Sequence, residues 1–211
     1  FFAEEADKHS SHSTTLDEYV RAYSRAYYKL DLWYRQYFEH SIPLGNDVLA
    51  PLTTLIEAMY SNIFQEVLYP QWDAILESNP TFSGDVLHQE SFYDSFVAPQ
   101  PVKVAVVISD ALRYEVGHEL ADVLNATLGG TAVIAPMLSS LPSITTMGMA
   151  ALLPHVALTY DGSNVLLDGQ ACSTNSDRNV ILSKNTDAGA ITYADIKAMS
   201  SSDARDYFKR Q

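Results

Sequence analysis

The side chains best suited to chemistry lie in a hydroxyl-rich stretch in the second half of the sequence. Five serines and threonines fall within eight positions, namely Ser139, Ser140, Ser143, Thr145 and Thr146. The stretch is expected between a strand and a short apolar helix. A hydroxyl at a helix start can cap the helix. It can also be a nucleophile, because the helix dipole and free N–H groups favour an alkoxide and an incoming phosphate. The residues leave both roles open.

A nucleophilic hydroxyl in this stretch would need activation from elsewhere in the chain. No general base lies nearby, and the Gly-x-Ser-x-Gly pattern of hydrolases is absent. Activation by a bound metal ion is the remaining route. Asp110, at the end of a β-branched run, is the obvious carboxylate to hold the metal, but it could equally cap the helix predicted after it. In that helix, Arg113 could bind a phosphate or pair with Glu115 or Glu119 across solvent.

An alternation of strand and helix is expected to place Asp110 at a sheet edge. Residues 102–108 form a nearly continuous apolar run, which is typical of a strand buried on both faces of a parallel sheet. Residues 111–125 carry apolar side chains at helical spacing, and residues 131–135 are predicted to form a second strand. The three segments make a βαβ unit. Open α/β sheets bind ligands at the carboxyl ends of their strands, where Asp110 stands.

The first hundred residues are predicted to be helical. Apolar and aromatic side chains recur at helical spacing over residues 16–38 and again over residues 46–68. Thr15 and Glu18 have the spacing of a capping box. The aromatic stripe of the first helix could stack on nucleic-acid bases or form the seam between two antiparallel helices. Few basic residues flank it, and this favours the seam.

The sequence divides at a Pro99-Gln100-Pro101 linker into a helical region over residues 1–98 and an α/β domain over residues 102–211. The predicted fold class is therefore α/β, with a partial parallel sheet, preceded by an all-α region. Beyond the hydroxyl-rich stretch, short strands are expected on either side of an Asp161-Gly162 turn. A polar surface loop is expected over residues 170–177, with Cys172 as a plain thiol.

Composition excludes several classes of protein. The chain has 211 residues, with 13 Lys and Arg against 26 Asp and Glu, and its net charge of −13 argues against an autonomous nucleic-acid binder. A membrane-spanning helix needs about 18 consecutive apolar residues, and the sequence has no such window. The single cysteine fits a reducing compartment, and the expected location is the cytoplasm. Because the sequence opens without Met and ends within an amphipathic helical pattern, a segment of a larger protein is expected.

Two stretches resemble motifs of a known family. Residues 107–115, Val-Ile-Ser-Asp-Ala-Leu-Arg-Tyr-Glu, resemble the strand-end motif of PglZ proteins, and residues 141–155 resemble that family's second motif. PglZ proteins belong to bacterial BREX phage-defence systems, and their PglZ domain resembles the alkaline phosphatase superfamily. The resemblance implies that Asp110 is a metal ligand. It also implies a nucleophile that is itself a metal ligand. Thr145 stands three residues after a proline, as in the phosphodiesterase branch, with Ser143 and Thr146 as rivals.

The resemblance implies a metal-dependent phosphoryl-transfer hydrolase acting in phage defence, of phosphatase, phosphodiesterase or nuclease-like type. The expected metal is zinc, with manganese or magnesium as alternatives. No histidine follows His155, itself interpreted as a helix-terminal residue, so the remaining ligands are expected beyond residue 211 and the segment alone is expected to be inactive. The implied partners are other BREX proteins, and DNA in the full complex. The alternative function is a catalytically silent scaffold that binds other BREX proteins.

Overall fold

The computed structural model describes residues 13–79, 84–127, 129–185 and 188–210. These residues cluster into two compact units, each built from two stretches of the chain. The first unit, here called the helical unit, holds the described residues up to Val86 together with Ala111–Pro136. The second unit, here called the mixed unit, holds Leu87–Asp110 together with the described residues from Met137 onwards. These two units do not coincide with the predicted division of the chain at residues 98–102. That the regions before and after this division fold independently stays a prediction.

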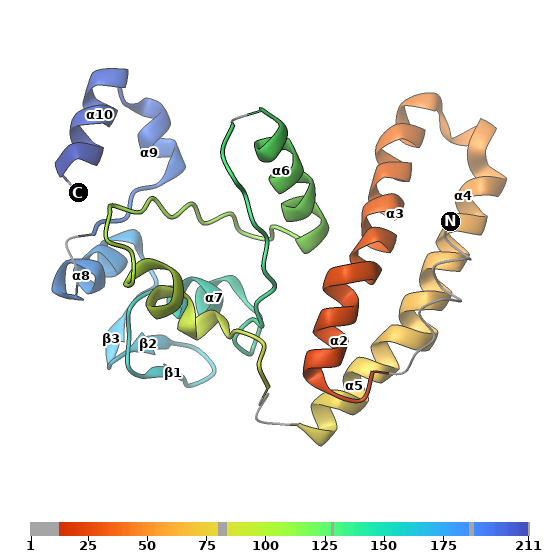
Figure 1. Ribbon diagram of the computed structural model, residues 1–211, viewed down its shortest axis with the longest axis horizontal. Helices are drawn as coiled ribbons and strands as arrows, with labels where there is room; N and C mark the ends of the chain where they lie inside the picture. Colours follow the sequence, from red (N-terminus) through yellow and green to blue (C-terminus); the bar gives the residue numbers. More distant parts are fainter. Residues whose placement is uncertain (1–12, 80–83, 128, 186–187, 211) are drawn as a thin grey trace. The chain divides into compact units, whose positions relative to one another are not determined.

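The helical unit consists of two long helical rods and one further helix (Figure 1). The first rod comprises α2 (Leu16–Ala22), η1 (Tyr23–Tyr27) and α3 (Tyr28–Ser41), and η2 (Ile42–Leu44) connects it to the second. The second rod comprises α4 (Asn46–Ile63), η3 (Phe64–Leu68) and α5 (Tyr69–Ser78), and the further helix is α6 (Tyr114–Thr127). The predicted capping box is present. The Thr15 hydroxyl accepts a hydrogen bond from the Glu18 N–H at 3.2 Å, and the Glu18 carboxylate accepts one from the Thr15 N–H. The two predicted helices are thus confirmed.

The aromatic stripe forms the seam between the two rods. Tyr27 and Leu30 of the first rod are buried together with Phe64 and Leu68 of the second. Burial of such side chains is worth about 1.5–3 kcal/mol each before the entropic cost of ordering them. The interpretation as a seam between antiparallel helices is therefore confirmed for these residues.

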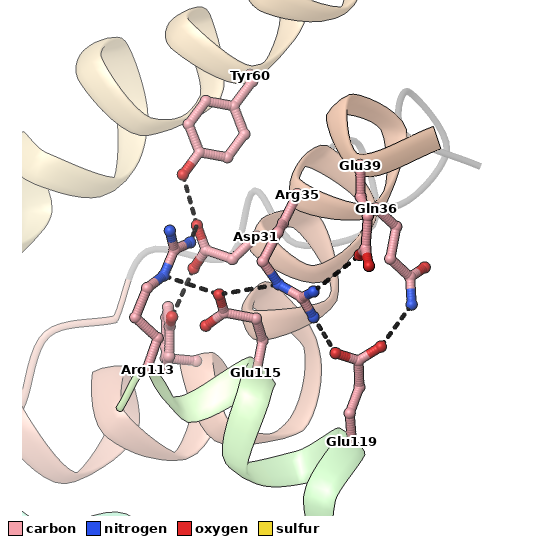
Figure 2. Close-up of polar contacts among 9 residues, drawn as sticks. Asp31, Arg35, Gln36, Glu39, Tyr60, Arg113, Glu115 and Glu119 are labelled. Atoms are coloured by element: carbon pink, nitrogen blue, oxygen red, sulfur yellow. Dashed lines mark hydrogen bonds and ion pairs between the residues drawn. The ribbon is translucent and has the colours of Figure 1, made fainter. Parts of the chain in front are cut away.

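A buried carboxylate, Asp31, lies beside this seam, where it contacts Tyr60 and Arg113 (Figure 2). It is 6% exposed. The Tyr23 hydroxyl donates to Asp31 Oδ2 at 2.5 Å, and the Tyr60 hydroxyl donates to Asp31 Oδ1 at 2.5 Å. Arg113 Nη2 lies 3.7 Å from Oδ1. A buried charge is tolerated when it is paired and hydrogen-bonded, and this arrangement joins three helical elements to the segment that leads into α6.

Helix α6 is tied to α3 through a second buried carboxylate, Glu115, which is 0% exposed (Figure 2). Its Oε1 lies 2.8 Å from Arg113 Nε and 3.8 Å from Arg35 Nε. The Arg35 guanidinium also pairs with Glu119, whose other carboxylate oxygen accepts a hydrogen bond from Gln36 Nε2 at 2.7 Å. Of the two roles predicted for Arg113, the structure shows the pairing with Glu115. The Glu115 carboxylate is buried in the helix interface, however, rather than exposed to solvent.

The tyrosines of the seam predict how the helical unit responds to alkaline pH. Burial raises the pKa of Tyr19 from 10.0 to about 12. Burial and then the bond to Asp31 raise the pKa values of Tyr23 and Tyr60. A phenol with a raised folded-state pKa ionises first in the unfolded chain. Its contribution is therefore complete below pH 10.0 and is lost as the pH rises towards the folded-state value. Urea unfolding followed by tryptophan fluorescence should show stability falling above about pH 10, whereas a constant midpoint there would contradict these assignments.

The mixed unit combines short helices with a small sheet. Its elements are η4 (Gln89–Ser91), η5 (Tyr93–Val97), α7 (Thr145–Ala151), β1 (Leu158–Tyr160), β2 (Val165–Leu167), β3 (Gln170–Ala171), α8 (Asn175–Asn185), α9 (Tyr193–Ala198) and α10 (Ser201–Arg210). The three strands form an antiparallel sheet in the order β1-β2-β3, with Leu158 opposite Leu167 and Leu166 opposite Ala171. The all-α region followed by a mixed α/β region matches the predicted class.

The hairpin between β1 and β2 is closed by the predicted Asp161-Gly162 turn. Asp161 Oδ1 accepts hydrogen bonds from the N–H groups of Ser163 at 2.9 Å and Asn164 at 2.7 Å, and Gly162 has a φ of 93°. These bonds lower the pKa of the Asp161 carboxyl. Aspartate and glycine suit such a turn because one bonds to the following backbone and the other tolerates positive φ.

The core of the mixed unit joins α7, the sheet and α8. The buried side chains that share it are Met147, Ala150, Leu153, Val165, Leu167, Cys172, Ile181 and Leu182. Cys172 is a free thiol in this core, and burial raises its pKa. The surface loop predicted over residues 170–177 is therefore wrong. Residues 170–171 form β3, Cys172 is buried, and α8 begins at Asn175.

The two predicted parallel strands are not formed. Residues 102–108 and 131–135 have no strand hydrogen bonds within the described part of the chain, and Val107 is 90% and Val133 86% exposed. A β-branched run becomes a strand only where a neighbouring strand supplies hydrogen bonds and a surface to pack on. The helix expected over 111–125 begins at Tyr114 and ends at Thr127. None of the helices described here has the length and apolar character to cross a membrane.

Candidate active site

Asp110 lies at the end of the apolar run, in a turn before α6. It is exposed, and the next residue, Ala111, has a φ of 55°. Because α6 begins only at Tyr114, Asp110 does not cap that helix. The capping interpretation is therefore wrong, and the carboxylate is available for another role.

Thr145 is the first residue of α7, and its hydroxyl contacts Asp110. Thr145 Oγ1 lies 3.2 Å from Asp110 Oδ2 and 3.4 Å from Oδ1, and it donates to the carboxylate. The preceding residue, Ile144, is the N-cap, with extended backbone angles of −109° and 154° and no side-chain bond to the helix. The structure thus brings together the two residues predicted for the site, although they are far apart in the sequence.

The two rival hydroxyls are placed differently. Ser143 and Thr146 are exposed, and neither shows a hydrogen bond to Asp110 among the described residues. Thr145 is therefore the candidate nucleophile whose hydroxyl faces the candidate metal ligand. The geometry separates three hydroxyls that the residue types alone left equivalent.

Helix α7 is held firmly beneath its exposed first residue. Met147, Ala150 and Ala151 are buried, and the helix packs against β1 and β2. The Gly148 N–H donates to the Ile144 carbonyl at 2.9 Å and closes the first turn. The site therefore combines an exposed hydroxyl with a backbone anchored in the core of the mixed unit.

Asp110 and Thr145 could provide two oxygen ligands to a divalent metal. Carboxylate and hydroxyl oxygens are hard ligands, and both side chains are exposed, so their chemistry fits one edge of a coordination sphere. Within residues 13–79, 84–127, 129–185 and 188–210, no three His, Cys, Asp or Glu side chains gather as a metal site would require. His155 donates from Nδ1 to the Leu153 carbonyl at 2.7 Å, and it lies beyond the C-cap of α7, Leu152, rather than at the helix end.

Comparison with known proteins identifies the second part of the chain. Residues 89–211 match the family described as the BREX system PglZ alkaline phosphatase-like domain. The chain belongs to the PglZ family. Both Asp110 and Thr145 lie within the matched PglZ domain, and the resemblance drawn from residues 107–115 and 141–155 is confirmed.

Two curated relatives extend the similarity beyond the PglZ domain into the helical region. The chain is 35% identical over 204 residues to the alkaline phosphatase-like protein BrxZ of Escherichia coli O9:H4 (strain HS), covering 90% of this chain and 24% of the relative. It is 34% identical over 197 residues to the alkaline phosphatase-like protein PglZ of Bacillus cereus (strain H3081.97), covering 89% and 23%. The chain thus spans about a quarter of the length of these relatives. No solved structure shows a significant match.

The PglZ domain also holds contacts that the sequence did not indicate. Gln89 and Glu90 of η4 approach the loop that leads to Thr145, with Ser140 Oγ donating to Glu90 Oε1 at 3.1 Å. Ser140, predicted only as one of several hydroxyls, is therefore engaged in this loop. A local reading of spacing gives no signal for a contact between such distant segments.

Proposed function

We propose that this chain carries part of the active site of a metal-dependent phosphoryl-transfer hydrolase that acts in BREX phage defence. The supporting observation is the contact of Thr145 Oγ1 with Asp110 at 3.2 Å inside a PglZ alkaline phosphatase-like domain. The substrate class is a phosphate monoester or diester. Within the proposal, Thr145 is the catalytic nucleophile and Asp110 the residue that holds both its hydroxyl and the metal.

The chemistry of the two side chains supports a two-step transfer. Thr145 Oγ1 would attack phosphorus while the bond from phosphorus to the leaving oxygen breaks. The hydroxyl proton would pass to solvent, and the leaving oxygen would take up a proton from solvent and depart as the alcohol or phenol. Water would then attack the phosphothreonine and return the hydroxyl, releasing inorganic phosphate when the substrate is a monoester and a phosphate monoester when it is a diester. Asp110, which already accepts the hydroxyl hydrogen bond, orients Oγ1 for the attack. Exposure of both residues leaves room for a substrate to approach.

A metal ion held by Asp110 and Thr145 would stabilise the alkoxide and the charge that develops on the phosphoryl oxygens. Zinc is our first choice, and manganese or magnesium are alternatives, because oxygen ligands are compatible with all three. Two oxygen atoms are too few for a closed site, so we expect the remaining ligands beyond residue 211 of the full-length protein. We therefore expect turnover from the full-length protein and little from this segment alone.

The proposal predicts that turnover depends on a divalent metal. Treatment of the full-length protein with a chelator should lower its turnover of an aryl phosphate monoester or diester at least about a hundredfold. The reason is that metal stabilisation of the transition state is worth several kcal/mol. Activity should return on addition of Zn²⁺, Mn²⁺ or Mg²⁺, and the most effective ion identifies the metal. Turnover that persists through chelation would contradict a metal-dependent reaction.

A matched pair of variants connects this dependence to the site. Asp110→Ala should lose metal affinity and turnover together, and Asp110→Asn should keep a weakened site through its carbonyl oxygen. Asp94→Ala is the control, because Asp94 is an exposed aspartate of the same unit that the proposal gives no role. A retained phage-defence phenotype in cells that make Asp110→Ala at normal levels would instead favour the scaffold that binds other BREX proteins.

A further inference from the structure

We infer that Gln89 is a positioning residue for the Thr145 hydroxyl, and this inference rests on the proposed function. Gln89 is the first residue of η4, and it lies far before Thr145 in the sequence of the PglZ domain. Its backbone and its side-chain amide contact the chain on both sides of Thr145. Together with Glu90 it forms a support that we call the η4 brace.

The backbone of the η4 brace is paired with the loop that leads to Thr145. The Leu138 N–H donates to the Leu87 carbonyl at 2.9 Å, and the Gln89 N–H donates to the Leu138 carbonyl at 2.8 Å. His88 and Leu138 accordingly form a parallel bridge. These bonds fix where the Gln89 side chain leaves the backbone relative to this loop.

The Gln89 side chain lies between the loop and the first turn of α7. Its Oε1 is 3.4 Å from the Ser140 N–H nitrogen, which donates to it. On the other side, a Cβ atom placed on Gly148 would lie 3.4 Å from Gln89 Nε2 and 3.6 Å from Oε1. These distances place the Gln89 amide against the first turn of α7, close enough that even an added Cβ at position 148 would only just touch it. One side chain thus supports the chain before and after Thr145.

Glu90 strengthens the same support at the neighbouring position. Its Oε1 accepts the 3.1 Å hydrogen bond from Ser140 Oγ, and Ser140 is 8% exposed. A hydrogen bond to a charged acceptor is stronger than one between neutral groups, and a buried hydroxyl left without its acceptor is costly. Ser140 is therefore held through its N–H by Gln89 and through its hydroxyl by Glu90.

The support bears on the reaction because Thr145 itself is exposed. Its hydroxyl contacts Asp110, and the direction of its Cα–Cβ bond follows the backbone over residues 140–148. A shift of about 1 Å in a reacting group can lower a rate about a hundredfold. A residue that fixes this backbone acts on the rate without touching the substrate.

The test compares variants of the full-length protein in steady-state turnover of an aryl phosphate ester. Gln89→Ala should lower kcat about tenfold to a hundredfold while KM changes less than about twofold, because substrate contacts remain. Gln89→Glu keeps the acceptor for the Ser140 N–H and should retain most of the kcat. Gln100→Ala is the matched control, since Gln100 is exposed in the same unit and should change neither constant.

Thr145→Ala run beside these variants separates the two claims. If Thr145→Ala abolishes turnover and Gln89→Ala leaves kcat unchanged, the positioning role is overturned while the proposed function stands. The positioning role is also overturned if Gln89→Glu loses as much kcat as Gln89→Ala and the melting temperature falls in parallel. Gln89 would then have a purely structural role. If turnover survives Thr145→Ala, the proposed function fails.

Amide hydrogen exchange tests the η4 brace independently of these activity measurements. In Gln89→Ala, the amides of residues 148–151, which make the first intrahelical hydrogen bonds of α7, should exchange at least about tenfold faster than in the wild type, because the helix start loses its support. Exchange of the β2 amides should not change. Unaltered exchange over 148–151 would overturn the brace, whatever the protein's activity.

Discussion

Replacing Thr145 with alanine should lower phosphoester turnover of the full-length protein by at least about a thousandfold. The substitution removes the oxygen that would form the covalent bond to phosphorus and, in the same step, one proposed metal ligand. Thr145→Ser keeps the hydroxyl and should retain part of the activity. Folding should survive both changes, because Thr145 is exposed and its side chain makes no capping bond to α7. Single-turnover kinetics and trapping of a phosphothreonine in the wild type provide the measurement.

Ser143→Ala and Thr146→Ala are the controls for this experiment. Both residues are exposed hydroxyls next to Thr145, and neither contacts Asp110 within the described residues. Their turnover should remain within about threefold of the wild type, as expected for residues that make no contact in the transition state. If one of them abolishes turnover and Thr145→Ala does not, the reaction class survives with a different nucleophile. If phage defence persists in Thr145→Ala at normal protein levels, the scaffold interpretation is favoured.

The features predicted correctly are those that depend on neighbouring residues. The Thr15–Glu18 capping box and the Asp161-Gly162 turn are formed as expected, because each is built from residues within three positions of one another. The two long helices follow from spacing alone. The lack of basic neighbours argues against base stacking by the aromatic stripe and so favours the seam between helices. The burial of Tyr27 agrees with this prediction.

The features predicted wrongly depend on partners distant in the sequence. Residues 102–108 have the composition of a buried strand, but composition cannot provide the neighbouring strand that would pair with them. The polar neighbours of Cys172 predict a surface loop, whereas the side chains of β2 and α8 enclose the thiol. The pairing of Asp110 with Thr145 was expected from the rule for strand ends, and the contact is present although the strands are not.

Two sets of contacts had no signal in the sequence. Gln89 is an ordinary residue in a loop-rich segment until the structure places its amide beside Gly148. Asp31 looks like a polar residue on a helix face until Tyr23 and Tyr60 are seen to converge on it. In both cases the partners lie on other elements, so local periodicity carries no information about them.

Asp31→Ala should destabilise the helical unit by about 3–6 kcal/mol, because two hydrogen bonds to a charged acceptor are lost and each is worth about 1.5–3 kcal/mol. The hydroxyls of Tyr23 and Tyr60 would lose the carboxylate that each bonds at 2.5 Å, and Arg113 would lose one of its two partners. Urea unfolding followed by tryptophan fluorescence measures the effect selectively, because the two tryptophans of the chain, Trp33 and Trp72, both belong to the helical unit.

Glu39→Ala is the matched control, because it removes a carboxylate from the same helix at a site that is exposed. Glu39 is 64% exposed in its side chain and pairs with Arg35 at 3.4 Å one turn away, so its loss should cost no more than about 0.5 kcal/mol. Equal effects of the two substitutions would contradict a special role for Asp31.

A double-mutant cycle with Tyr60→Phe separates the hydrogen bond from the charge. The single change should cost about 1.5–3 kcal/mol, as for a bond to a charged acceptor. In an Asp31→Ala background the same change should cost much less, because the acceptor is already gone. Additive losses would mean that the 2.5 Å contact contributes little and that Asp31 stabilises the seam mainly through Arg113.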